Sequence, residues 1–345
     1  MKNAVVYLRN SEGKEWLIQR IYCKTGCELY QPSAWKGKLV VKMLPVLSKC
    51  PISLFRTVQL NSFVPDSIIS LMQESFGNGC NYSAFMGTPG THKKPTIQVS
   101  RKKEILGYVK YSKESNIQRL FEKEQKTLNW LSEKGVPNVP KCLAMRVLDD
   151  STAVFIQSTK KKMGTNVEHV FGIKQKQFLD TLHHITKAQI PFESTEFYST
   201  IRYVQDNWGT LDNEEKKIIE KALKIIATTY SNRTVEFSAC HRDFTPWNTC
   251  IVDDFLFVFD WEYAQKTYPQ GIDQCHFIVQ TKKFEQHLSV DAIAKDITEN
   301  NYYGVGQLSF IAYCLDNVAL YMQRGMADDL EKVKEQIRLL GYIES

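Results

Sequence analysis

The chain has 345 residues, of which 43% are hydrophobic and 24% charged, and a formal net charge of +6. This length allows two compact parts that each bury a core, and the composition is typical of a globular protein. The mild basic excess comes without zinc-ligand spacing or a basic helix, so we expect no nucleic-acid partner.

Residues 1 to 78 form an N-terminal region in which we find no motif. Strand-like runs lie at Ala4–Arg9, Trp16–Tyr22 and Lys38–Leu44, and Pro51–Leu60 is a further candidate. We expect this region to be either an extra small α/β domain or an extension of the part that follows.

Residues 79 to 157 predict a small part that is rich in strands and has one helix, Asn116–Leu131, with apolar residues at helical spacing. A turn containing Gly87 and Gly90 separates the first two strands. The predicted strands are Tyr82–Met86, Thr96–Ser100, Glu104–Tyr111 and Thr152–Ser158.

Residues 158 to 345 predict a larger, mostly helical part. Its end, Gly304–Ser345, predicts two closing helices with apolar faces. Phe192–Trp208 carries three aromatic residues that could line a binding pocket, but buried helical core is the favoured interpretation.

The most informative segment lies within this helical part. His241–Asn248 has the sequence H-R-D-F-T-P-W-N, so Asn248 follows Asp243 by five residues. Asp260 ends an apolar run, Ile251–Phe259, that predicts a hairpin and brings the chain back beside Asn248. The spacing matches the H-R-D-x-x-x-x-N loop of kinases.

Phosphoryl transfer explains this combination of residues. One carboxylate accepts the proton of the attacking hydroxyl, while an amide oxygen and a second carboxylate hold magnesium. An isolated His-x-Asp is more often a turn or a cap, whereas the two matched elements in order favour catalysis.

His241–Glu262 resembles the catalytic segment of the aminoglycoside phosphotransferase and choline kinase superfamily, which contains small-molecule kinases related in fold to protein kinases. In that family the motif usually reads H-G-D, so Arg242 departs from it, while Asp260-Trp261-Glu262 matches the D-x-E pattern. The resemblance covers roughly residues 80 to 320. It implies an α+β, two-lobed fold, with a small β-rich lobe at 79–157, a helical lobe at 158–345 and residues 1–78 as an extension.

The resemblance also implies a role for each site residue. Asp243 would be the catalytic base, and Asn248 and Asp260 would hold Mg²⁺. Lys110 would contact the α- and β-phosphates of ATP, with GTP as the alternative nucleotide, and Glu124 would pair with Lys110. An exposed strand lysine is also an ordinary edge-protecting device, and Glu122 on the same helix is an alternative to Glu124.

The glycine turn is the least regular part of the pattern. Backbone N–H groups near Gly87 and Gly90 could bind phosphate, but the turn is not G-x-G-x-x-G, and Pro89 removes one donor. Lys93 and Lys94 could supply positive charge there instead, and a plain hairpin turn is the alternative.

Downstream residues complete the expected site. By the resemblance, Asp273 would brace the catalytic loop through its backbone, and His241 would organise that loop rather than act as a base. His276 is expected to be a helix histidine with satisfied hydrogen bonds rather than a ligand, and the resemblance implies that the helical His183 is a packing residue.

Two classes of function stay open. The first is an ATP-dependent kinase of a small-molecule hydroxyl, on an amino alcohol, a sugar, an aminoglycoside-like compound or an amino acid. The second is a nucleotide-binding pseudokinase or scaffold, which the irregular glycine turn favours and the intact Asp243, Asn248 and Asp260 oppose. Phosphorylation of proteins is disfavoured, because D-F-G and A-P-E do not follow the catalytic loop.

Location and partners are predicted only in outline. The nine cysteines are scattered, and the closest pair, Cys23 and Cys27, has no matching second pair or histidine set. Reduced thiols in a cytoplasmic protein are therefore expected. No run approaches the roughly 20 apolar residues of a membrane span, so we expect no membrane partner. The sequence predicts neither the acceptor nor the oligomeric state.

Overall fold

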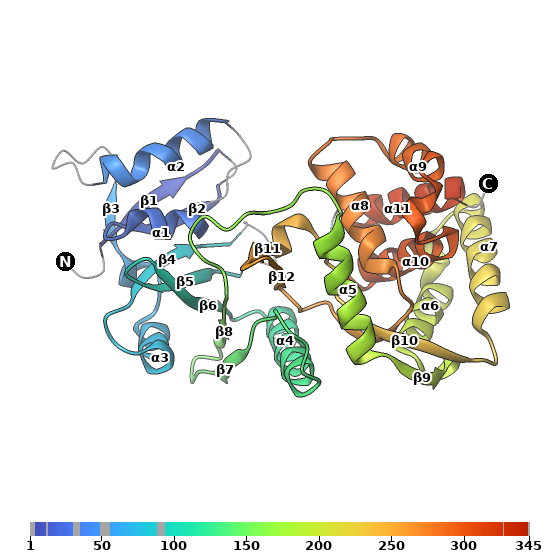
Figure 1. The fold of residues 1–345 in the computed structure, drawn as a ribbon, viewed down its shortest axis with the longest axis horizontal. Helices are drawn as coiled ribbons and strands as arrows, with labels where there is room; N and C mark the ends of the chain where they lie inside the picture. Colours follow the sequence, from blue (N-terminus) through green and yellow to red (C-terminus); the bar gives the residue numbers. More distant parts are fainter. Residues whose placement is uncertain are drawn as a thin grey trace. The chain divides into compact units, whose positions relative to one another are not determined.

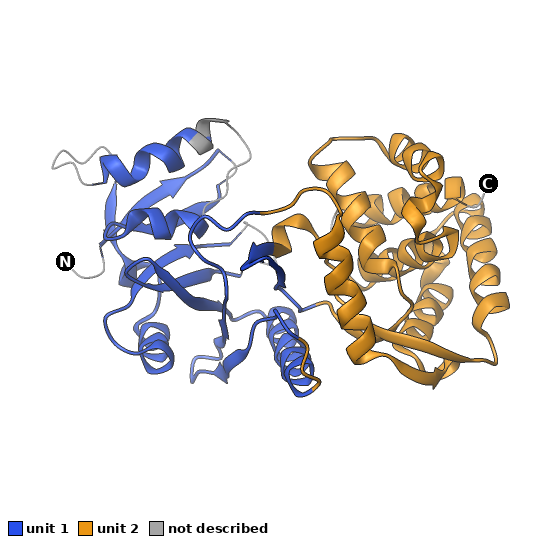
Figure 2. Cartoon of the chain, viewed as in Figure 1, with its two compact units in different colours: residues 1–133, 137–166, 250–262 blue, residues 134–136, 167–249, 263–345 orange. Residues whose placement is uncertain are grey.

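The computed structural model describes residues 4–11, 13–29, 35–48, 56–87, 94–326 and 328–343. The chain divides into two compact units (Figure 2). Unit 1 comprises residues 1–133, 137–166 and 250–262, and unit 2 comprises residues 134–136, 167–249 and 263–345.

Unit 1 is built around one antiparallel sheet of eight strands (Figure 1). In spatial order the strands are β3 (Thr57–Gln59), β1 (Ala4–Arg9), β2 (Glu15–Gln19), β4 (Asn81–Phe85), β5 (Thr96–Arg101), β6 (Glu104–Ser112), β8 (Ala153–Ser158) and β7 (Cys142–Val147). The first 78 residues thus contribute three strands to the same sheet as β4 to β8.

Strand β1 has buried residues on both faces of the sheet, since successive side chains of a strand point to opposite sides. In β1, Val5 packs in the cluster that includes Ile68 and Met72 of helix α3 (Asp66–Phe76). The next residue, Val6, packs in a different cluster with Cys23 of helix α1 (Cys23–Gly26). A continuous apolar strand is therefore what this sequence should form here.

One predicted strand is wrong. Lys38–Leu44 lies inside helix α2 (Trp35–Leu47). Val41 and Leu44, three residues apart, both pack against the cluster around Trp16 and Ile18, as neighbours on one helix face do. A short apolar run cannot be assigned from periodicity alone. Pro51–Leu60 contains β3, and its residues 51–55 lie outside the described residues.

Helix α4 (Ser115–Glu133) packs on the end of the sheet formed by β6, β7 and β8. The predicted hairpin is also present, as β11 (Thr249–Val252) and β12 (Phe255–Val258). Its turn residues, Asp253 and Asp254, both have positive φ, which is the backbone of a tight hairpin turn.

Unit 2 is mainly helical. Its three-stranded sheet has the order β13 (Gln265–Tyr268), β10 (Thr234–Cys240) and β9 (Ala188–Pro191). Its helices are α5 (Ile173–Thr186), α6 (Glu196–Asn207), α7 (Asn213–Tyr230), α8 (Ile272–Phe284), α9 (Val290–Glu299), α10 (Gln307–Arg324) and α11 (Asp329–Ile343).

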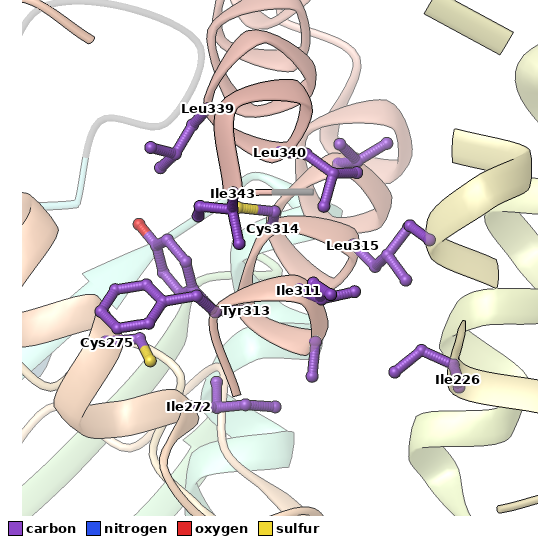
Figure 3. Packing of buried hydrophobic residues seen from close by; sticks show 14 of the residues in the cluster. Ile226, Ile272, Cys275, Ile311, Tyr313, Cys314, Leu315, Leu339, Leu340 and Ile343 are labelled. Atoms are coloured by element: carbon purple, nitrogen blue, oxygen red, sulfur yellow. The ribbon is translucent and has the colours of Figure 1, made fainter. Parts of the chain in front are cut away.

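The core of unit 2 surrounds α10. Every residue from Phe310 to Ala319 is buried, as expected for a helix enclosed by other elements. Figure 3 shows members of this core from four helices: Ile226, Ile272, Leu315 and Leu340. The prediction of two closing helices is confirmed by α10 and α11.

The α+β prediction is confirmed, with the antiparallel sheet in one unit and most helices in the other. Within the described residues, no helix combines the length and the apolar character that crossing a membrane requires.

Candidate active site

Lys110 is a buried cation held by two carboxylates. It lies on β6, and its Nζ is 2.8 Å from Oε2 of Glu124 and 2.6 Å from Oδ1 of Asp260. The side chains of Lys110 and Glu124 are 6% and 0% exposed, whereas that of Asp260 is 27% exposed. A charge this deeply buried needs partners, and both carboxylates supply them.

The carboxylates around Lys110 raise its pKa. Burial lowers the pKa of Lys110, but Asp260, Glu124 and Glu262 outweigh burial, so the pKa is raised and the amine stays protonated. Burial, with Asp260 and Glu262 close by, raises the pKa of Glu124 above its ordinary value, although Lys110 lowers it.

Glu124 also contacts the segment that carries Asp260. Its Oε1 accepts a hydrogen bond of 3.2 Å from the backbone N–H of Trp261, while Oε2 accepts one from Lys110. Glu122, the alternative, is exposed. The signal was available in the helical spacing, because Glu124 is in phase with the buried apolar residues Ile117, Phe121, Leu128 and Leu131.

Asp260 has a backbone conformation that is uncommon for residues other than glycine. Its φ is +70°, in the left-handed region that glycine favours. Such strain in a non-glycine residue is common at functional sites. The conformation directly follows β12 and precedes Trp261, which is fully buried and donates from Nε1 to the carbonyl oxygen of Val258 at 3.0 Å.

Three carboxylates of unit 1 converge. One oxygen from each of Glu124, Asp260 and Glu262 lies within 4.8 Å of the others. Both oxygens of Glu262 accept from Nζ of Lys94 at 2.5 Å. Carboxylate oxygens are the ligands that Mg²⁺ prefers, and Asp260 is the most exposed of the three, so the residues present fit a magnesium ion bound through Asp260.

Sequence reasoning gave Lys94 no carboxylate partner, because a pair 168 residues apart leaves no local signal. Gly87 is buried and has a φ of +84°, so its backbone does require glycine or a strained substitute. Gly90 and Lys93 lie outside the described residues. Phosphate binding at this turn stays a prediction.

In unit 2, Asp273 binds the backbone of the predicted catalytic loop. It lies in the first turn of α8, and its two oxygens accept from the N–H groups of His241 and Arg242, each at 2.8 Å. The φ of Arg242 is +65°, so the loop bends sharply at the point that Asp273 binds. This is the geometry that the predicted bracing role requires.

Arg242, the residue that departs from the family motif, forms a buried ion pair. Its Nε and Nη2 lie 2.9 and 2.7 Å from the two oxygens of Asp316 on α10. Tyr268 donates to Asp316 at 3.0 Å, and the Arg242 guanidinium lies 5.4 Å from the Tyr268 ring centroid. Asp316 was not predicted, although a carboxylate in a mostly apolar stretch of helix already signals a buried partner.

Asp243 lies at the centre of the loop and is 33% exposed. The Asn248 side chain donates from Nδ2 to Asp243 Oδ2 at 2.8 Å and to the Asp243 carbonyl at 2.9 Å. That arrangement assigns the other amide atom of Asn248, Oδ1, as the atom that fits a metal ligand. The backbone N–H of Asp243 donates to Nδ1 of His241 at 3.2 Å, which is consistent with an organising role for His241.

His276 also contacts Asp243, which sequence reasoning missed. Its Nε2 lies 3.3 Å from Oδ1 of Asp243, and its ring meets Tyr313 edge-on. His276 follows Asp273 by three residues on α8, so helical spacing places both on one face. That spacing was the signal that could have identified it.

A cavity of about 210 Å³ opens beside Asp243 within unit 2. Residues of α8, α10 and α11 line it together with the loop: Arg242, Asp243, Tyr263, His276, Gln280, Lys283, Phe284, Asn317, Leu320, Tyr321, Arg324, Lys332 and Gln336. The segment Phe192–Trp208 contributes instead to a separate hollow, through Tyr198 and Trp208, and its Phe197 and Val204 are core residues.

Part of the chain matches a known protein family. Residues 111–270 match the model of the phosphotransferase enzyme family, APH. Protein LicA of Haemophilus influenzae strain KW20 / Rd is 23% identical over 195 residues, which cover 48% of this chain and 71% of that protein. A second Haemophilus influenzae LicA is also 23% identical, and 56% of its length is covered.

Solved structures with low sequence identity share the fold. The apo form of a thermostable mutant of aminoglycoside phosphotransferase APH(4)-Ia has a TM-score of 0.51 at 10% identity, covering 80% of this chain and 97% of that one. The same enzyme in a ternary complex with ADP and hygromycin B has a TM-score of 0.50 at 12% identity, covering 80% and 98%.

Choline kinase LicA from Streptococcus pneumoniae has a TM-score of 0.50 at 14% identity, covering 80% of this chain and 98% of that one. These likenesses show a protein-kinase-like fold. The match to the phosphotransferase enzyme family covers residues 111–270 of the chain.

Proposed function

We propose that the chain transfers the γ-phosphate of ATP, with Mg²⁺, to a hydroxyl group of a small molecule. The observation that carries this proposal is the buried Lys110 between Glu124 and Asp260. Burying a cation among three carboxylates is weak as a stabilising device. It is well suited to binding a phosphate chain together with a divalent cation.

Under this proposal, the site residues of unit 1 bind the nucleotide. Lys110 binds the α- and β-phosphates, and Glu124 fixes its position. Asp260 is the proposed Mg²⁺ ligand on unit 1, and Asn248 is a proposed Mg²⁺ ligand on unit 2. When bound, the metal neutralises charge on the phosphates.

The residues of the loop act on the acceptor. Asp243 orients the acceptor hydroxyl and accepts its proton while the new O–P bond forms and the bond between the γ-phosphorus and the β-phosphate oxygen breaks. Asp273 and His241 fix the loop that carries Asp243. Catalysis is then mainly positioning and charge neutralisation.

The nucleotide and the acceptor remain at the level of proposal. ATP is proposed, with GTP as the alternative that the same binding measurement separates. The acceptor is an amino alcohol, a sugar, an aminoglycoside-like compound or an amino acid. We assign the reaction to the cytoplasm, where ATP is available and where the free cysteines of the described residues stay reduced.

The test compares wild type with Asp243→Asn and with the control Asp180→Asn, which changes an exposed carboxylate on α5. Turnover of Mg-ATP and Mg-GTP is measured against a panel of alcohols, amino alcohols, sugars and amino acids. Asp243→Asn is expected to lower kcat by on the order of a thousandfold with nucleotide binding retained. Asp180→Asn is expected to match wild type.

Two other outcomes decide against the proposal. Nucleotide binding without turnover of any acceptor would favour a pseudokinase or scaffold. Failure of both nucleotides to raise the melting temperature in the presence of Mg²⁺ would rule out both a kinase and a nucleotide-binding pseudokinase.

A further inference from the structure

The cavity beside Asp243 has a strongly basic wall. Four cationic side chains line it, from Arg242, Lys283, Arg324 and Lys332, and Asp243 is the one carboxylate among the lining residues. A wall of this charge is unusual beside a group that has to accept a proton. It indicates which chemical class of acceptor fits there.

The carboxylates that balance these cations are not part of the wall. Arg242 pairs with Asp316, and Arg324 and Lys332 both pair with Asp329. Asp316 and Asp329 are each 2% exposed, and neither lines the cavity. Lys283 pairs with Glu335, which is 27% exposed and does not line the cavity either. The carboxylates of Asp316, Asp329 and Glu335 therefore all lie outside the lining that holds the four cations.

The carboxylate of Asp329 remains ionised in this position. Burial raises its pKa, but hydrogen bonds from Arg324 and from the backbone N–H of Met326 outweigh burial and hold the pKa at about 2. Arg324 donates to it from Nε and Nη2, and Lys332 donates from Nζ at 3.3 Å. Arg324 and Lys332 are thus fixed by one buried anion.

Two of the three phenylalanine or tyrosine rings that line the cavity, Tyr321 and Phe284, already receive cations of this chain, and the third is Tyr263. Arg324 and Lys332 lie 5.1 and 5.7 Å from the centroid of the Tyr321 ring, and Lys283 lies 5.5 Å from that of Phe284. A quaternary ammonium group needs an aromatic face for itself. Here it would also meet like charge, so the wall disfavours a cationic acceptor.

The cavity is also small. Its volume of about 210 Å³ lies below the roughly 300 Å³ at which pockets for drug-sized ligands begin. An acceptor that fits within it is compact, closer in size to a hydroxy acid or a monosaccharide derivative than to an aminoglycoside.

We propose that the acceptor is a compact hydroxy compound that carries an anionic group, either a carboxylate or a phosphate. Its hydroxyl lies at Asp243, and its anionic group is bound by Lys332 and Arg324. This inference rests on the proposed function, because it specifies the acceptor of the same reaction.

The test measures kcat/KM with Mg-ATP for two matched series of acceptors. The small series is the three-carbon compounds glycerate, glycerol 3-phosphate and glycerol, with choline as its cationic member, and the six-carbon series is gluconate, glucose 6-phosphate, glucose and glucosamine. We expect an anionic member to exceed the neutral and cationic members by about tenfold or more, the effect of one charge-assisted hydrogen bond. Comparing the carboxylates, glycerate and gluconate, with the two phosphate esters shows which anionic group the site prefers.

Lys332→Gln provides the matched perturbation, and Lys334→Gln, an exposed lysine on the same helix, is the control. Lys332→Gln is expected to raise KM for the anionic acceptor about tenfold with little change in kcat. The control is expected to leave both constants unchanged. Preferred turnover of choline, glucosamine or a neutral member would overturn the inference and leave the proposed kinase activity standing.

Direct binding separates failure of this inference from failure of the proposed function. The shift of melting temperature with glycerate, gluconate and the two phosphate esters is measured for wild type, Lys332→Gln and Lys334→Gln without nucleotide. A shift that Lys332→Gln alone abolishes supports the anionic site even if no turnover is found. No shift with any anionic compound, together with no turnover of one, overturns it.

Discussion

Nε2 of His276 lies 3.3 Å from Oδ1 of Asp243. The same helix, α8, carries Asp273, whose carboxylate accepts from the backbone N–H groups of His241 and Arg242. One helix therefore contacts both the backbone of the loop and the side chain that the proposed reaction uses. The position of Asp243 depends on α8 in two separate ways, and each can be tested by itself.

The first test concerns Asp273. In Asp273→Asn an amide NH₂ group replaces one of the two acceptor oxygens, so one buried N–H of the loop loses its partner. We expect a loss of about 2 kcal/mol in the free energy of unfolding and a fall in kcat. Urea unfolding and turnover measure both. Asp180→Asn, in an exposed ion pair of α5, is the control and is expected to change stability by less than about 0.5 kcal/mol. Equal effects of the two substitutions would contradict the bracing role.

The second test concerns His276. His276→Phe removes the nitrogen beside Asp243, whereas His276→Gln keeps a donor there. We expect kcat to fall about tenfold in the phenylalanine variant, KM for ATP to stay unchanged, and the glutamine variant to recover part of the loss.

His184→Gln, on an exposed face of α5, is the control for these variants. A purely packing role for His276 would give the opposite order, because phenylalanine preserves the ring that contacts Tyr313. Melting temperatures of all variants show whether the fold is retained.

The third test separates two glutamates of α4. Glu124→Gln removes one partner of buried Lys110, so the free energy of unfolding is expected to fall by on the order of 3 kcal/mol, with weaker ATP binding. Glu122→Gln, two residues away and exposed, is expected to stay within about 0.5 kcal/mol of wild type. Calorimetry of ATP binding and urea unfolding give the two readouts. Equal weakening of ATP binding by both substitutions would exclude Glu124 as the partner of Lys110.

The choice between these glutamates shows which features of the site can be predicted from sequence alone. Helical spacing alone puts Glu124 on the buried face of α4, so local pattern was sufficient to find it. Strands β1, β2, β4, β5, β6 and β8, the hairpin at Asp253-Asp254 and the two closing helices were predictable for the same reason: each has a signal within about 20 residues. The short run Lys38–Leu44 was not, because strand and helix bury such a run equally well.

The unpredicted parts of the site are pairings between distant residues. Lys94 pairs with Glu262 and Arg242 with Asp316, 168 and 74 residues apart. No periodicity or motif spacing encodes such pairs. They arise only when sheet register and helix packing bring the two elements together, so a single sequence shows the charges but not their partners.

The fourth test uses pH. Hydrogen bonds from Arg324 and Met326 hold the pKa of Asp329 at about 2 against an ordinary value of 3.8, although burial raises it. A carboxylate with a depressed folded-state pKa stabilises the fold fully above its unfolded-state pKa, and this stabilisation is lost as pH falls through the folded-state value. The free energy of unfolding of wild type minus that of Asp329→Asn is therefore expected to be constant from pH 7 to about 5 and to shrink between about pH 4 and 2. Urea unfolding at each pH measures it, and a difference that stays constant down to pH 2 would contradict the assignment.

The fifth test asks what Arg242 contributes in place of the glycine that is usual in the family motif. Arg242→Met leaves the buried carboxylate of Asp316 without its cation and with only the hydrogen bond from Tyr268, so we expect the free energy of unfolding to fall by about 3 kcal/mol. The double variant Arg242→Met with Asp316→Leu removes both charges, so most of the loss is expected to be recovered.

The turnover of the double variant separates two roles of the ion pair. If kcat recovers together with stability, the ion pair supports the loop only by completing the core. Recovered stability with kcat still low would instead show that the guanidinium, fixed by Asp316, orients the loop at Asp243. A double variant no more stable than Arg242→Met would contradict the pairing, and urea unfolding with turnover decides among these outcomes.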